Sequence, residues 1–147
     1  MYADIKSTRN QIVAHFRDNR LLKGYTHDFT PKKDVFHLTV EQGQETGNTL
    51  EVKTADLKAL FFVKTLEGDS SYAEKNRYEE VDTSRLIGMK IKVEFYDGEI
   101  IRGISLNYQK GKKGFFITPL DPQSNNDRIF VVADAIRNIT VGDDAER

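Results

Sequence analysis

The sequence has no cysteine, no tryptophan and only three prolines among its 147 residues. Without cysteine, disulfide bonds, thiolate nucleophiles and cysteine-ligated metal sites are excluded. No stretch approaches about 18 consecutive apolar residues, the length that a membrane-spanning helix needs. The segment from Met1 to Gln11 also lacks the apolar region of a secretion signal. We therefore expect a cytoplasmic protein.

The chain also lacks an excess of charge of either sign, with 22 Lys and Arg against 23 Asp and Glu. A net charge of -1 gives no general attraction for nucleic acid or for an anionic membrane. Charged residues nevertheless make up 31% of the chain, above the roughly 25% of an average globular protein. The composition predicts a folded, well-hydrated protein with one domain or two very small ones.

An internal repeat runs through most of the sequence. Residues 12–63 align with residues 91–142 at a constant offset of 79, without a gap. Identical residues stand at nine of these positions: Ile12/Ile91, Phe16/Phe95, Asp18/Asp97, Gly24/Gly103, Lys33/Lys112, Phe36/Phe115, Thr39/Thr118, Gln44/Gln123 and Val52/Val131. A register held over this length predicts a duplicated unit. We expect a first domain at residues 11–66, a polar linker at 67–88 and a second domain at 89–142.

The apolar periodicity within each unit is typical of strands. Ile91, Val93 and Phe95 alternate with Lys92 and Glu94, as in a strand with one buried face. Short Ala- and Asp-rich turns at residues 54–56 and 133–135 precede the last strand of each unit. Five short strands per unit predict an all-β fold built from two small bent barrels.

Two features of the strands predict how the barrels are shaped and joined. Gly24 and Gly103 stand within strands at matching positions, where a glycine indicates a bulge or a sharp bend. The run Leu60 to Val63 breaks the alternation, so either both of its faces are covered, which we favour, or one ring is exposed for a partner. A barrel of this size is marginally stable alone. We therefore expect the two barrels to pack on each other as a pseudo-dimer.

The linker between the units is polar, and its stretch from Tyr72 to Val81 is compatible with one short helix. No other segment has the pattern of an amphipathic helix.

Resemblance to known families supports the barrel interpretation. The run Val93 to Ile104, with its Asp-Gly hairpin and glycine-containing second strand, resembles the first motif of Sm-like small barrels, which belong to the SH3-like type. Longer segments are similar to those of an uncharacterised bacterial family of about this length; they are Asp56 to Lys64, Glu67 to Asp69, Gly114 to Phe116 and Ser124 to Val132. The first resemblance implies a tandem Sm-like or SH3-like fold, and the second implies no known activity.

The loop from Gly24 to Lys33 also resembles, in part, the PilZ domain, a barrel that binds cyclic di-GMP. Thr26 and Asp28 follow the PilZ hairpin pattern, but Lys33 stands where that pattern requires glycine. The amino-terminal arm has only Arg9 in place of an arginine pair.

Lysines gather at one hairpin of each unit, with an aromatic residue just before them. An aromatic ring beside basic side chains is a pattern that binds single-stranded nucleic acid or a phosphorylated partner. The alternative is a solvated turn, where lysine discourages edge-to-edge strand pairing. A loop rich in turn-forming residues at 121–127 is a further candidate for recognition. The candidate ligand- or partner-binding residues are Phe29, Lys32, Lys33, Tyr108, Lys110, Lys112, Lys113, Asn125 and Asn126.

Catalytic and metal-binding patterns are weak. His15, His27 and His37 lie on or near adjoining strands of the first unit, but strand alternation directs them to different faces, so no metal site is predicted. Nucleophile motifs and glycine-rich phosphate loops are absent from the sequence. Asp97 and Glu99 lie at a tight turn, where a carboxylate usually binds local backbone.

We therefore expect a non-enzymatic protein without a cofactor that acts as an interaction or adaptor module for a protein partner. The alternative is binding of nucleic acid or a cyclic dinucleotide through the lysine-bearing hairpins. The near-neutral charge of each unit favours the first of these. The sequence leaves the partner and the oligomeric state open.

Overall fold

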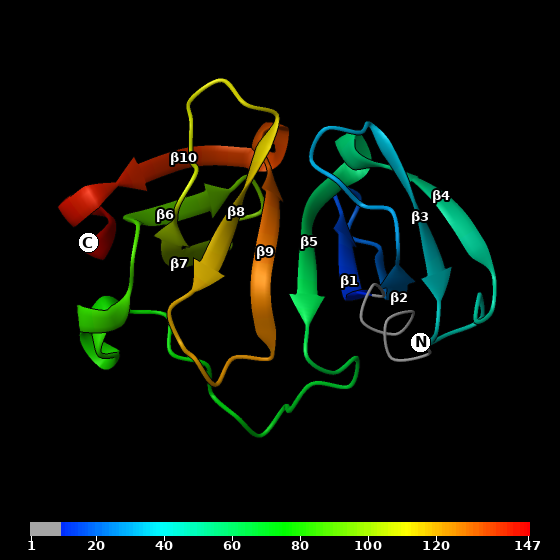
Figure 1. Cartoon of the computed structure of the whole chain (residues 1–147), viewed down its shortest axis with the longest axis horizontal. Helices are drawn as coiled ribbons and strands as arrows, with labels where there is room; N and C mark the ends of the chain where they lie inside the picture. The colour runs from blue at the N-terminus through cyan, green and yellow to red at the C-terminus, as the bar shows by residue number, and fades with distance from the viewer. Residues whose placement is uncertain (1–9) are drawn as a thin grey trace, which may run out of the picture.

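A computed structural model describes residues 10–147 and shows an all-β protein (Figure 1). Ten strands form one antiparallel sheet in the order β10-β6-β7-β8-β9-β5-β1-β2-β3-β4. The strands are β1 (Asn10–Phe16), β2 (Leu21–Thr26), β3 (Val35–Val40), β4 (Thr49–Lys53), β5 (Leu57–Val63), β6 (Met89–Phe95), β7 (Ile100–Ser105), β8 (Gly114–Pro119), β9 (Asn126–Val132) and β10 (Ile136–Val141). Within this part of the chain the only helical segments are short 3₁₀ turns: η1 (Thr54–Asp56), η2 (Tyr78–Glu80), η3 (Thr83–Arg85), η4 (Ala133–Ala135) and η5 (Gly142–Glu146).

The two halves of the sheet repeat the same strand order. In the first half the order is β5-β1-β2-β3-β4, and in the second it is β10-β6-β7-β8-β9. The pairing registers match at the same offset as the sequence: Ile12 lies opposite Gly24, and Ile91 opposite Gly103. The sequence repeat is therefore also a repeat of strand order and register.

The halves meet at one pair of strands, which we call the junction. β5 of the first half pairs with β9 of the second, with Ala59 opposite Val131, Leu60 opposite Phe130 and Phe61 opposite Ile129. The all-β prediction is confirmed, but the contact between the halves differs from the packing of two separate bodies. Edge-to-edge pairing makes the sheet continuous, because it gives partners to the backbone groups of both edges as well as covering their side chains.

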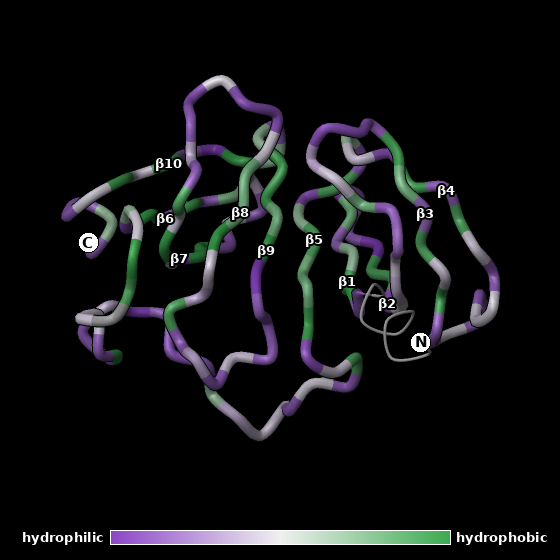
Figure 2. The backbone as a smooth tube through the Cα atoms, in the orientation of Figure 1, coloured by the Kyte–Doolittle hydropathy of each residue, from purple (hydrophilic) through white to green (hydrophobic). Residues whose placement is uncertain are grey.

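Both faces of β5 are buried, as the run Leu60 to Val63 predicts. Leu60 and Phe62 face a core in the first half that also contains Phe130. Phe61 and Val63 face a core in the second half. Figure 2 shows the hydrophobic colour along β5, between the two halves. Each core therefore contains side chains from both halves.

The matching glycines allow strands to approach closely. A Cβ atom at Gly24 would lie 1.9 Å from the carbonyl oxygen of Thr39, and one at Gly103 would lie 2.4 Å from that of Thr118. Thr39 and Thr118 are themselves equivalent in the repeat. The pairing of these strands shows no register shift at either glycine, so the predicted bulge is absent there, and the close approach of the neighbouring strand is what excludes a larger residue.

The stretch at 72–81, which the sequence left compatible with one short helix, does not form an α-helix. Only the 3₁₀ turn η2 forms there, and the linker crosses the second half in an extended path. Two tyrosines hold it: the Tyr72 hydroxyl donates to Asp121, and the buried Tyr78 hydroxyl lies 2.9 Å from the carbonyl oxygen of Ile91 and 2.8 Å from that of Gly103. These tertiary contacts outweigh a weak local helix preference.

Candidate functional site

The two lysine-bearing loops come together at one end of the junction. The loop between β2 and β3 and the loop between β7 and β8 lie on the same side of the molecule, at the top of Figure 1. Between them runs a groove of about 610 Å³. Its lining residues are Pro31, Lys33, Asp34, Val35, Lys53, Thr54, Ala55, Gly111, Lys112, Lys113, Phe130, Val132, Ala133 and Asp134. We call this the junction groove.

Cations outnumber carboxylates in the lining of the junction groove. Four lysines face two aspartates, which leaves an excess of two positive charges. Lys113 Nζ lies 3.4 Å from Asp34 Oδ1, but both side chains are more than four-fifths exposed. An ion pair this exposed contributes at most about 1 kcal/mol, so an incoming anion can replace it.

The floor of the junction groove is apolar. Phe130 and Val132 of β9 are buried beneath it, and Val35 and Pro31 form part of its wall. An apolar floor with a cationic rim suits a ligand that carries both apolar and acidic groups.

Of the predicted lysines, Lys33, Lys112 and Lys113 line the junction groove. Lys32 is exposed outside it, and its backbone N–H donates to the Thr30 hydroxyl. Lys110 lines a neighbouring hollow beside β10. The structure thus brings together lysines from loops that are 79 residues apart in the sequence.

The predicted aromatic residues pack inward. The Phe29 ring contacts four other rings, with centroid distances of 5.2 Å to Phe36 and to Phe130, 5.8 Å to Phe62 and 6.4 Å to Phe116. These contacts make Phe29 part of the first core and not a platform on which a base would stack.

Tyr108, the equivalent of Phe29, packs against Phe115 at a centroid distance of 4.8 Å. It remains partly exposed and lines the hollow beside β10.

The two predicted asparagines lie at the other end of the junction. Asn125 Oδ1 accepts hydrogen bonds from the Thr65 amide at 3.1 Å and its hydroxyl at 3.2 Å, while Nδ2 donates to the Thr65 carbonyl at 2.8 Å. Asn126 begins β9, where its amide donates to the Ser124 hydroxyl. These contacts fasten the turn after β5 and are remote from the junction groove.

The histidines have separate partners. His15 packs on Phe61 at 4.4 Å, and burial lowers the pKa of its imidazole. His37 Nδ1 lies 2.7 Å from Asp28 Oδ2. Burial alone would raise the pKa of Asp28, but hydrogen bonds from His37 and Thr26 lower it. Among residues 10–147 no three acidic or histidine side chains gather as metal ligands.

A family model matches residues 8–142, which include all ten strands. The chain belongs to a family of unknown function, DUF6982. No curated protein and no solved structure matches it. Because the match includes both halves, the matched region of this chain contains the junction and the groove beside it.

In this DUF6982 chain a second contact, centred on Lys58, joins the halves. Lys58 Nζ donates to Asp97 Oδ2 at 2.7 Å and also to Glu99, and it lies 4.7 Å above the centre of the Phe95 ring. Asp97 Oδ1 also accepts from the Glu99 amide at 3.0 Å, as predicted for a hairpin carboxylate. The lysine hydrogen bond lowers the pKa of Asp97. This cluster fixes the β6–β7 turn against β5.

Sequence reasoning missed Lys53, Asp134 and Phe130 of the junction groove. The only sequence signal was that Asp134 lies in the turn at 133–135 and that Lys53 directly precedes the equivalent turn at 54–56. These regions adjoin because β5 pairs with β9, and that pairing was not predicted.

No helix in the described part of the chain is long and apolar enough to cross a membrane.

Proposed function

We propose that this protein is a non-enzymatic interaction module whose junction groove binds an acidic, partly apolar segment of a partner protein. The observation that carries this proposal is the meeting of Lys33 and Lys112, from equivalent loops, over the apolar floor made by Phe130. Lysines on opposite walls attract carboxylates, and the floor accepts an apolar side chain between them.

The groove favours a peptide over nucleic acid. A strand of nucleic acid needs aromatic platforms and a long basic path. Phe29 is instead packed among four rings, and Asp34 and Asp134 interrupt the basic lining. A short peptide with carboxylates spaced around an apolar residue matches this mixture of groups.

Binding can be tested by fluorescence anisotropy with a labelled peptide of alternating glutamate and phenylalanine. We expect saturable binding that weakens as salt rises, because exposed charges are screened. The double variant Lys33→Glu/Lys112→Glu should lower the affinity about tenfold or more. The matched control Lys32→Glu/Lys75→Glu carries the same charge change outside the groove and should bind like the wild type.

Three results would contradict the proposal: no binding at low salt, equal losses in both double variants, or a tighter fit to another ligand class. The last is examined by competition with a short single-stranded oligonucleotide and with cyclic di-GMP. If either competes strongly and depends on Lys33 and Lys112, the groove is a nucleotide site instead.

We also infer that each five-strand half is a small bent barrel of the Sm-like or SH3-like type. The shared strand order and the close strand approach at Gly24 and Gly103 support this inference. Interstrand contacts within each half, measured by NMR, would test it. A cytoplasmic location is part of the same proposal, and subcellular fractionation would check it.

A further inference from the structure

The two outer edges of the sheet are the repeat equivalents of the two strands that pair at the junction. At the offset of 79, β10 corresponds to β5, and β4 corresponds to β9. β4 and β10 are the end strands of the sheet, so each has an edge without a strand partner in the described chain. The chain therefore carries both sides of a second junction, one at each end.

The internal junction shows how such edges fit. Phe130 of β9 lies opposite Leu60 of β5, and its ring packs against Phe29 at 5.2 Å. Phe29 and Leu60 correspond to Tyr108 and Ile139 in the second half. Tyr108 and Ile139 line a hollow of about 300 Å³ beside β10. This hollow is the place that an equivalent of Phe130 would occupy.

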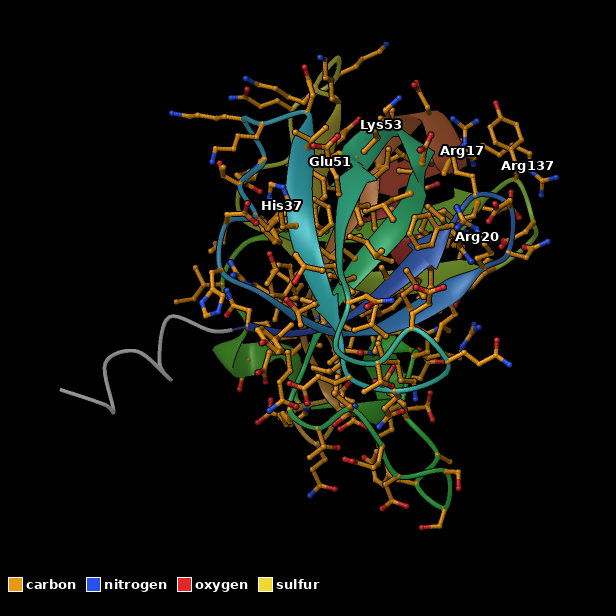
Figure 3. The ribbon with its side chains drawn as sticks, turned by 90° about the vertical axis from the view of Figure 1, so that its right-hand side faces the viewer. Arg17, Arg20, His37, Glu51, Lys53 and Arg137 are labelled. Carbon is orange, nitrogen blue, oxygen red and sulfur yellow. The ribbon has the colours of Figure 1, made fainter. Side chains whose placement is uncertain are left out.

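The equivalent of Phe130 on the free edge of β4 is Glu51. Glu51 is exposed, and Figure 3 shows it on the side of the molecule formed by β3 and β4. The hollow beside β10 is lined by three cations and no carboxylate; the cations are Lys110, Lys112 and Arg137. Arg137 is paired with Glu94 at 2.9 Å. Among the described residues no ion pair involves Lys110 or Lys112, so they are available to a glutamate.

We propose that β4 of one molecule pairs with β10 of a second copy in the register of the internal junction. That register places Glu51 opposite Ile139, Leu50 opposite Thr140 and Val52 opposite Asn138. Glu51 of one molecule then enters the basic hollow beside β10 of the next. At the junction inside the chain, Phe130 occupies the equivalent position and packs against the Phe29 ring. Because the two edges are different, the contact is head-to-tail and produces a closed ring or an open chain of molecules.

This contact is weaker than the junction inside the chain. Phe61 and Phe130 of the junction are replaced by Thr140 and Glu51, so less apolar surface is buried. Attraction between Glu51 and the lysines is screened by salt. The attraction between Glu51 on β4 and the lysines beside β10 favours the pairing of these two edges. Exposed charges on the edges discourage other edge pairings.

Sedimentation velocity of the full chain tests this association at protein concentrations from about 10 µM to about 1 mM, a range in which weak association is detected. At low salt the average mass should rise with concentration above the monomer mass of 16.8 kDa, and high salt should reverse the rise. Glu51→Lys and Lys110→Glu should each abolish the rise. The double variant Glu51→Lys/Lys110→Glu should restore it, because the charges are exchanged.

A monomer at every concentration in low salt overturns the proposal, and so does association that Glu51→Lys leaves unchanged. Both residues are exposed, and urea unfolding of each variant verifies that the fold is kept. Neither lines the junction groove, so failure here leaves peptide binding in that groove untouched.

Discussion

β5 and β10 hold the same place in the two halves, but their surroundings are opposite. Every residue of β5 is buried, whereas only Ile136 of β10 is. The strands that face them differ in the same way: β9 ends in four buried apolar residues, and β4 has one buried residue, Val52. The two edges that meet are therefore apolar, and the two equivalent edges left outside are largely polar. Because burial of apolar surface stabilises a contact, we expect the junction to contribute far more to stability than any contact of the outer edges.

The comparison is sharpest at Phe130 and Glu51, which are equivalent positions. Phe130→Ala should lower the free energy of unfolding by about 3–5 kcal/mol, because it removes a ring that is 2% exposed and leaves a cavity between the halves. Glu51→Ala should change it by less than about 0.5 kcal/mol. Urea unfolding of dilute protein measures both. Similar effects at the two positions would mean that the junction is not the main contact.

A second pair of equivalent residues, Leu60 and Ile139, compares the strands β5 and β10. Leu60 lies opposite Phe130 at the junction, whereas Ile139 lies on the free edge. Leu60 is fully buried, and Leu60→Ala should cost about 3 kcal/mol. Ile139 is half-buried at the free edge, so Ile139→Ala should cost about 1 kcal/mol. The same unfolding experiment is decisive, and a larger loss at Ile139 would reverse the comparison.

Gly24 and Gly103 test a feature that the two halves share, the close approach of the neighbouring strand. Gly24→Ala and Gly103→Ala each bring a Cβ atom into the backbone of the neighbouring strand, so each should lower stability by about 1–3 kcal/mol. Thermal unfolding followed by circular dichroism measures both variants. A loss of stability in only one variant would show that the close approach of the neighbouring strand matters in that half alone.

These pairs also show how much of the structure the sequence predicts. The repeat, the strands and the turns at 54–56 and 133–135 follow from local periodicity and from the offset of 79. Pairing of β5 with β9 does not, since strand pairing at a distance depends on which edges meet. The buried run Leu60 to Val63 indicated only that something covers both faces.

The candidate site was predicted in part for the same reason. The lysines were found as loop residues, but their meeting in one groove follows from the junction. Phe29 was expected to be available to a ligand because it precedes lysines. A loop has no regular periodicity from which the direction of a side chain could be predicted. Here the Phe29 ring packs into the core of the first half.

The last pair consists of Lys58 and Arg137, equivalent cations that each bind carboxylates. Lys58 has 11% of its side chain exposed and binds Asp97 and Glu99, whereas the pair between Arg137 and Glu94 is exposed by 51% and 28%. Lys58→Met should therefore cost about 1–3 kcal/mol near neutral pH. Arg137→Met should cost less than about 1 kcal/mol.

The two variants should also differ in their response to acid. The hydrogen bond from Lys58 holds the pKa of Asp97 below its usual range. Its contribution to stability is present above the unfolded-state pKa of about 4 and is lost as the pH falls through the lower folded-state pKa. Lys58→Met removes that contribution at all pH values, so its stability should fall less steeply than that of the wild type as the pH decreases below about 4. Urea unfolding across this range measures the slopes, and parallel slopes would show that Asp97 gains nothing from the lysine that joins the halves.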